Sequence, residues 1–304
     1  MNPGIYPGLP MADYLALPAV NATIIKTIID ECPRAAWWES WFNADLEVET
    51  SDYMDLGTVA HAILLEGSQA CVQIIDYPDW RTNAAKAQRD EARALGKIPM
   101  LACKMPAVEA MVASAREFID SVKLTEPAIW QAFQQDGGES EVTMVWQDGP
   151  TLCKIRPDRI STDRKLIVDA KFTGTSAEPD GWGRTQMIRM AYYVGAAFYR
   201  RGCRALFETL PEYVFLVVQT DPPYLCSAVG VDPHAFELGA AKVEAGLRMW
   251  AACAAANRWP AYPNRCVYPE IPAWEDARWQ EREDAEVARG FPYQPEQLFG
   301  GIKA

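Results

Sequence analysis

The chain has 304 residues, with 29 Lys and Arg against 41 Asp and Glu, so its formal net charge at pH 7 is −12. Apolar residues make up 49%, which is too high for a disordered protein and typical of a globular one. No apolar run approaches the roughly 20 residues that cross a bilayer, and the N-terminus has no signal-peptide pattern. We therefore expect a cytoplasmic protein without a membrane partner. Taken alone, the acidic charge argues against a nucleic-acid partner.

The first part of the chain is predicted to be helical. Residues 1–20 are rich in Pro and Gly and predict an extended arm. Asn21 is a candidate N-cap for a helix that continues to about Glu31. Further helices are predicted over residues 57–67, 83–95 and 106–122. We therefore expect a helical N-terminal part over residues 1–135.

A change of pattern after residue 135 predicts a sheet. Strands are predicted over residues 141–147, 151–156, 165–172, 213–219 and 225–231, and helices over residues 185–201 and 234–257. The last part, residues 261–304, is rich in Pro, Trp and charge and predicts an irregular covering segment. The order of elements predicts one α/β domain over residues 1–304 with its core at residues 136–260.

Two carboxylates and a lysine are predicted to meet on one patch of this core. Asp169 and Lys171 share a face of their strand because strand side chains alternate. If the preceding turn is centred on Asp163 and Arg164, Asp158 lies opposite Asp169. Paired carboxylates favour a bound cation, and Asp oxygens are ordinary Mg²⁺ ligands. A nearby lysine can orient water or neutralise a phosphate. The simpler alternative is a hairpin with solvated surface charges.

Several segments, in order along the chain, resemble one family of nucleases. Pro157-Asp158 with Asp169-Ala170-Lys171 resembles the PD-(D/E)XK signature. The blocks at residues 57–67 (GTVAHAILLEG) and 192–202 (YYVGAAFYRRG) resemble those of the RecE-like exodeoxyribonuclease VIII group of phages and prophages. The resemblance implies a restriction-endonuclease-like core, in which a mixed central sheet is flanked by helices, with a helical N-terminal elaboration.

The same resemblance implies an activity and a set of site residues. It implies a Mg²⁺-dependent exonuclease, with Mn²⁺ as a substitute, that digests duplex DNA ends 5′-to-3′ in phage-type homologous recombination. A ring-shaped homo-oligomer, a single-strand annealing partner and the cytosol of a bacterial host are implied with it. Asp158, Asp169, His61 and the Ala170 carbonyl would bind the metal. Lys171 would be the catalytic lysine, and Glu141 is a candidate accessory carboxylate.

Candidate DNA contacts are less firmly defined by the sequence. They are Tyr199, Arg156, Gln186 and Arg200. The family helix usually carries Q-x-x-x-Y, and this chain has Gly195 where the glutamine is expected. Two alternatives therefore stay open. One is an endonuclease, or a nuclease for another nucleic acid, with the same fold. The other is a catalytically weak module that binds DNA or a protein.

The distribution of charge weakens the objection to a DNA partner. Residues 151–204 contain 11 Lys and Arg but only 5 Asp and Glu, two of which are the proposed ligands Asp158 and Asp169. The rest of the chain therefore carries more than the whole net negative charge. Because association depends on the local field at a cleft more than on total charge, the basic segment favours a polyanionic substrate.

Overall fold

The computed structural model describes residues 1–46, 55–67 and 72–289. Residues 1–261 form one compact unit, and the chain from Tyr262 onward forms a second. The first unit contains every candidate site residue. Within the part of the chain that the structure describes, no helix is long and apolar enough to cross a membrane.

The central sheet of the first unit has five strands. Their order is β10 (Cys226–Gly230), β9 (Glu212–Gln219), β8 (Leu166–Thr173), β7 (Arg159–Ser161) and β4 (Gly138–Ser140). β8 and β9 are parallel, whereas the other neighbours are antiparallel, so the sheet is mixed. A second sheet contains β1 (Gly4–Tyr6), β5 (Thr143–Asp148) and β6 (Thr151–Ile155), and β2 (Val72–Ile75) pairs with β3 (Ile98–Leu101).

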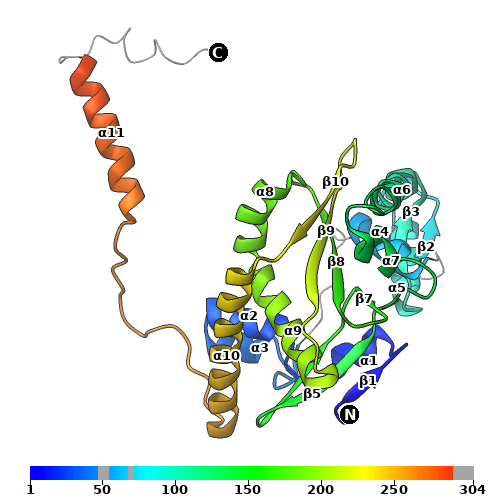
Figure 1. The fold of residues 1–304 in the computed structure, drawn as a ribbon, viewed down its shortest axis with the longest axis horizontal. Coiled ribbons are helices and arrows are strands. Elements are labelled where there is room, and N and C mark those ends of the chain that lie inside the picture. The colour runs from blue at the N-terminus through cyan, green and yellow to red at the C-terminus, as the bar shows by residue number, and fades with distance from the viewer. Residues whose placement is uncertain (47–54, 68–71, 290–304) are drawn as a thin grey trace. The chain divides into compact units, whose positions relative to one another are not determined.

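Helices cover both faces of the central sheet (Figure 1). One face packs against α4 (Asp55–Glu66), α6 (Met105–Ser121) and α7 (Pro127–Ala132). The other face packs against α2 (Ala22–Asp30), α3 (Pro33–Trp38), α8 (Pro179–Trp182), α9 (Tyr192–Phe207) and α10 (Pro233–Ala256). α5 (Asn83–Ala94) connects β2 to β3 and packs against both strands, and the short η2 (Ala102–Lys104) follows β3. Side chains alternate along β8. Val168 and Ala170 therefore pack in the hydrophobic cluster on the face covered by α4, and Ile167 packs in the cluster on the face covered by α9.

The sequence predicts an extended arm over residues 1–20, and this prediction is wrong for part of the segment. Residues Met11–Ala16 form α1, and the buried Lys154 on β6 explains its stability. The Lys154 ammonium donates hydrogen bonds to the carbonyl oxygens of Tyr14 and Leu17, both at 2.8 Å, and of Leu15 at 3.2 Å. These carbonyls lie at the end of the helix, where a cation is favoured and partners within the helix are missing. The contact joins distant parts of the chain, so local sequence does not reveal it.

The prediction of a single helix over residues 185–201 is also wrong. A π-helical turn, η3 (Gly183–Met187), follows α8, and α9 begins only at Tyr192. Ala191 interrupts the path with a left-handed backbone (φ 48°), which a right-handed helix does not contain. In the second unit, the segment expected to be irregular contains α11 (Ala273–Arg289). That stretch has no Pro or Gly, although its flanks do.

Candidate active site

The β7–β8 hairpin brings the two aspartates together. Arg159 pairs with Val168 and Ile160 with Ile167, which confirms the predicted turn centre and aligns Asp158 with Asp169. The Ala170 amide donates a hydrogen bond to Oδ2 of Asp158 at 2.8 Å. The position of the Asp158 carboxylate is therefore fixed by the backbone of the neighbouring strand.

His61 reaches the site because α4 lies close to β8. A Cβ on Gly57 would lie 3.1 Å from the Cβ of Phe172, so a larger residue would push the helix away from the strand. His61 is one turn further along α4 and lies on the same face as Gly57. Its Nε2 is 2.9 Å from Oδ2 of Asp158. Gly57 therefore allows α4 to approach β8 closely enough for the His61 imidazole to contact Asp158.

Glu141 enters the same cluster from an unusual backbone conformation. It precedes β5 instead of starting it, and its φ of 55° lies in the left-handed region that non-glycine residues rarely adopt. Its amide donates to the carbonyl oxygen of Pro157 at 3.1 Å. His61, Glu141 and Asp158 each offer one potential ligand atom, and these atoms lie within 4.8 Å of one another.

Asp169 lies beside this group and is bonded to two other side chains. Its Oδ1 pairs with the Lys171 ammonium, and its Oδ2 accepts a hydrogen bond from the Tyr213 hydroxyl at 2.8 Å. The Lys171 ammonium also lies 5.1 Å from the ring centre of Tyr192. Sequence reasoning missed Tyr213. The signal available was its odd position on β9, which puts it on the same sheet face as Asp169 once β8 and β9 are known to be parallel.

Burial and crowding shift the pKa values of the carboxyl groups in different directions. Burial raises the pKa of Asp169 to about 6, with a further contribution from Asp158 and opposition from Lys171. Burial also acts to raise the pKa of Asp158, but His61 and Lys171 hold it below its usual value. The pKa of Glu141 is raised by burial and by Asp158, against the effect of Arg156. These groups resist simultaneous ionisation, a conflict that a bound cation relieves.

The two basic groups of the site respond to the same carboxylates. Burial acts to lower the pKa of His61, but its contact with Asp158 raises the value above normal. Burial likewise acts to lower the pKa of Lys171, and Asp169 and Asp158 outweigh it, so the ammonium form is favoured. Lys171 is therefore a fixed positive charge, whereas His61 must release its Nε2 proton before it can bind a metal.

The donor set fits a hard divalent cation. Carboxylate oxygens of Glu141 and Asp158 are ligands that Mg²⁺ and Mn²⁺ prefer, and the His61 imidazole is more typical of the transition metal. Asp169 and Ala170, which the resemblance adds to the ligands, lie next to this group. In the structure, Asp169 is bonded to Lys171 and Tyr213, and Ala170 contributes its amide to Asp158.

Two of the candidate DNA contacts are engaged inside the protein. The guanidinium of Arg156 donates to Oε2 of Glu141 at 2.6 Å, to the Leu9 carbonyl at 2.7 Å and to Oγ1 of Thr143 at 3.0 Å. The Tyr199 hydroxyl donates to the carbonyl oxygen of Arg156 at 3.3 Å. Both side chains therefore support the carboxylate cluster, Arg156 directly and Tyr199 through the Arg156 backbone.

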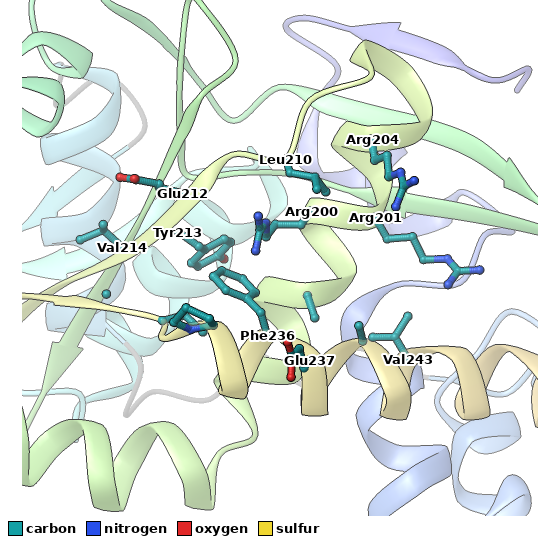
Figure 2. A pocket seen from close by; sticks show the side chains of 15 residues that line it. Arg200, Arg201, Arg204, Leu210, Glu212, Tyr213, Val214, Phe236, Glu237 and Val243 are labelled. Carbon is teal, nitrogen blue, oxygen red and sulfur yellow. The ribbon is translucent and has the colours of Figure 1, made fainter.

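The other two candidates lie elsewhere. Gln186 is on the π-helical turn and accepts a hydrogen bond from Arg189 at 3.3 Å. Arg200 lines a cavity of about 730 Å³ formed by α9, β9 and α10. Figure 2 shows it beside Tyr213 and Phe236, and its guanidinium carbon is 4.0 Å from the Phe236 ring centre. The stacking on Phe236 holds this cation within the cavity.

Comparison with known proteins agrees with this architecture. A structure described as a "Putative exonuclease" from Eubacterium rectale is similar over 96% of both chains, with 14% sequence identity and a TM-score of 0.55. The alkaline exonuclease LHK-Exo from Laribacter hongkongensis matches 77% of this chain and 97% of its own, with 13% identity and a TM-score of 0.25. The first similarity shows a shared fold, and the second is too low to support an argument.

No curated protein matches the chain. A family model described as a PDDEXK-like domain of unknown function (DUF3799) matches residues 23–271. The match includes His61, the β7–β8 hairpin and Tyr213, and it agrees with the mixed sheet flanked by helices. The chain therefore belongs to the PDDEXK-like DUF3799 family.

Proposed function

We propose that this protein is a metal-dependent nuclease that hydrolyses phosphodiester bonds at the ends of linear duplex DNA. One observation carries the proposal. His61, Glu141 and Asp158 bring three potential ligand atoms within 4.8 Å of one another, next to the Asp169–Lys171 pair. Solvated surface charge does not explain this arrangement, because the cluster combines partly buried groups from α4, the β7–β8 hairpin and the segment before β5.

His61, Glu141 and Asp158 would hold a divalent cation, with Asp169 at the edge of the set. When bound, the cation would polarise the phosphodiester and stabilise the leaving oxygen. Lys171 is cationic and paired with Asp169, so it is suited to neutralise charge that develops on the phosphate and to orient the attacking water. The Tyr213 hydroxyl keeps the Asp169 carboxylate turned toward Lys171. None of these roles requires a covalent intermediate.

The finer parts of the proposal depend on the resemblance to RecE-like nucleases. They are 5′-to-3′ polarity, a role in phage-type recombination, a single-strand annealing partner and a ring-shaped homo-oligomer. The description of the Eubacterium rectale structure as a "Putative exonuclease" is consistent with action at DNA ends. Within residues 151–204, Lys154, Arg156 and Arg201 are engaged inside the protein. The support for a polyanionic substrate therefore comes from Lys171 at the site and from the exposed Lys165, Arg184, Arg189 and Arg204.

Substrate geometry provides the test. Linear duplexes labelled at either the 5′ or the 3′ end, and covalently closed circles, are incubated with Mg²⁺, Mn²⁺ or EDTA. We expect loss of linear DNA only with metal, early release of the 5′ label and no change in closed circles. Cleavage of closed circles at the same rate would identify an endonuclease. Binding without hydrolysis of any DNA would identify a binding module.

A further inference from the structure

A second lysine lies beside the proposed catalytic one, on an element far away in sequence. The ammonium of Lys26, on α2, is 5.7 Å from the ring centre of Tyr192, and the ammonium of Lys171 is 5.1 Å from the same ring. The Tyr192 ring is fixed by contacts with Trp182 and Phe215, whose ring centres are 5.8 and 5.7 Å away. Two cations are therefore held around one rigid aromatic side chain.

The surrounding carboxylates are already engaged. Asp169 pairs with Lys171, Asp30 with Lys242 at 3.9 Å, and Glu39 accepts a hydrogen bond from Thr27 at 2.7 Å. Among the described residues, no carboxylate oxygen lies within 4.0 Å of the Lys26 ammonium. Burial and the nearby Lys171 both lower the pKa of Lys26. The charges of Asp169, Asp30 and Glu39 act in the opposite direction without cancelling them, so the position of Lys26 disfavours the charged form. An anion between the two lysines would remove this cost.

We infer that Lys26, Lys171 and the Tyr192 ring form a phosphate-binding subsite, in which Lys26 contacts a backbone phosphate of the DNA next to the bond that is hydrolysed. The inference rests on the proposed nuclease function. The Lys26 side chain is partly accessible to solvent, so a phosphate can reach its ammonium group.

The chain offers a matched control in Lys242. It is also a partly exposed lysine on a helix of the same face, and its ammonium lies 5.3 Å from the Tyr193 ring centre. Unlike Lys26, it has a carboxylate partner in Asp30. Lys26→Met and Lys242→Met therefore each remove a lysine stacked on a tyrosine. Only the first removes a cation without an acidic partner.

The test measures the dissociation constant for a linear duplex over a series of salt concentrations, with Ca²⁺ replacing Mg²⁺. Lys26→Met should weaken binding about 3- to 30-fold and lower the slope of log affinity against log salt by about 1. Lys26→Arg should restore most of both, and Lys242→Met should change neither. Lys26→Met should also unfold at no lower temperature than the parent, because it removes a poorly compensated charge.

The outcomes separate the subsite from the nuclease function. If the parent binds no DNA under these conditions, both proposals fail. If the parent binds DNA and Lys26→Met keeps its affinity and salt slope, the subsite is wrong and the nuclease function is unaffected. A loss of stability in Lys26→Met with an unchanged salt slope would show a structural role and would also overturn the subsite. Inorganic phosphate added at equal ionic strength should compete more strongly with the parent than with Lys26→Met.

Discussion

The Tyr213 hydroxyl donates a 2.8 Å hydrogen bond to Oδ2 of Asp169, whose other oxygen pairs with Lys171. The bond joins the neighbouring parallel strands β9 and β8 on one face of the sheet. The Tyr213 ring is buried against Phe215 and Tyr199, with ring centres 5.2 and 5.9 Å away. The hydrophobic core thus fixes a donor that orients a carboxylate of the site.

Replacing Tyr213 with Phe should therefore separate orientation from folding. Phe keeps the buried ring and removes only the donor, so the protein should stay folded, with a melting temperature a few degrees below that of the parent. Loss of a hydrogen bond to a charged group costs about 1.5–3 kcal/mol, and we expect a fall of roughly tenfold or more in kcat with little change in KM. Steady-state kinetics on linear duplex DNA provides the measurement. A parent-like kcat would show that Asp169 needs no help from Tyr213.

Metal affinity should depend on pH through His61. Its pKa is raised by Asp158, so the imidazolium form persists to higher pH than in a free histidine. The metal must displace that proton. The affinity for the metal should therefore fall as the pH is lowered, by up to about tenfold per pH unit for each proton displaced. Mn²⁺ titrations by calorimetry at pH 6, 7 and 8 would measure this fall.

His61→Gln is the comparison that isolates the histidine. Asp169, whose pKa is about 6, contributes to the pH dependence in both proteins. The variant should bind Mn²⁺ more weakly and with a shallower dependence on pH. If the two proteins show the same dependence, His61 is not a metal ligand.

The Asp148–Arg201 pair should contribute stability that acid removes. Nη2 of Arg201 donates to Oδ1 of Asp148 at 2.7 Å, and Nη1 donates to Glu244 at 2.7 Å. The hydrogen bond from Arg201 lowers the pKa of Asp148 below its unfolded value. The stabilisation is therefore complete above the unfolded pKa of about 3.9 and is lost as the pH falls through the folded pKa.

Asp148→Asn provides the test of this pair. At pH 7 the substitution should lower the free energy of unfolding by about 1–2 kcal/mol, because it removes a charge-assisted contact. Urea unfolding of both proteins at pH 7 and pH 3 would show the gap closing in acid. A gap of the same size at both pH values would contradict the assignment.

Gly195, which replaces the glutamine usual in the resembling family, has room for a side chain. An added Cβ would meet only the Cβ of Ala22, at 3.9 Å. Because glycine weakens a helix interior, Gly195→Ala should stabilise the protein by about 0.5–1 kcal/mol. Gly239 on α10 is the matched opposite, since a Cβ there would lie 2.7 Å from the Tyr193 carbonyl oxygen. Thermal unfolding should shift in opposite directions for the two alanine variants, and shifts of the same sign would contradict this packing.

The parts of the site that sequence predicted depend on short-range geometry or on the resemblance. A symmetric hairpin aligned Asp158 with Asp169, and strand alternation put Lys171 on the same face. His61 came from the resemblance, and the structure puts it 2.9 Å from Asp158. Whether these residues bind metal or act in catalysis stays a prediction.

The parts that sequence missed depend on contacts between distant elements. Tyr213 requires the parallel pairing of β8 with β9, and Lys26 requires the packing of α2 near the start of α9. The sequence predicted Arg156 and Arg200 as DNA contacts because local sequence does not reveal an internal partner. The structure gives Arg156 such a partner in Glu141 and Arg200 one in Phe236. Charge pattern alone cannot distinguish a free arginine from one engaged in this way.

Lys171 gives the most direct test of the proposed metal-dependent hydrolysis. Lys165 is the control, because it lies in the same hairpin with its side chain 78% exposed, 3.9 Å from Asp163. The measurement is the single-turnover rate of Mg²⁺-dependent hydrolysis of end-labelled linear duplex by the parent, Lys171→Ala and Lys165→Ala. We expect at least about a 100-fold loss for Lys171→Ala and a parent-like rate for Lys165→Ala. Equal rates for all three proteins would contradict the proposed site.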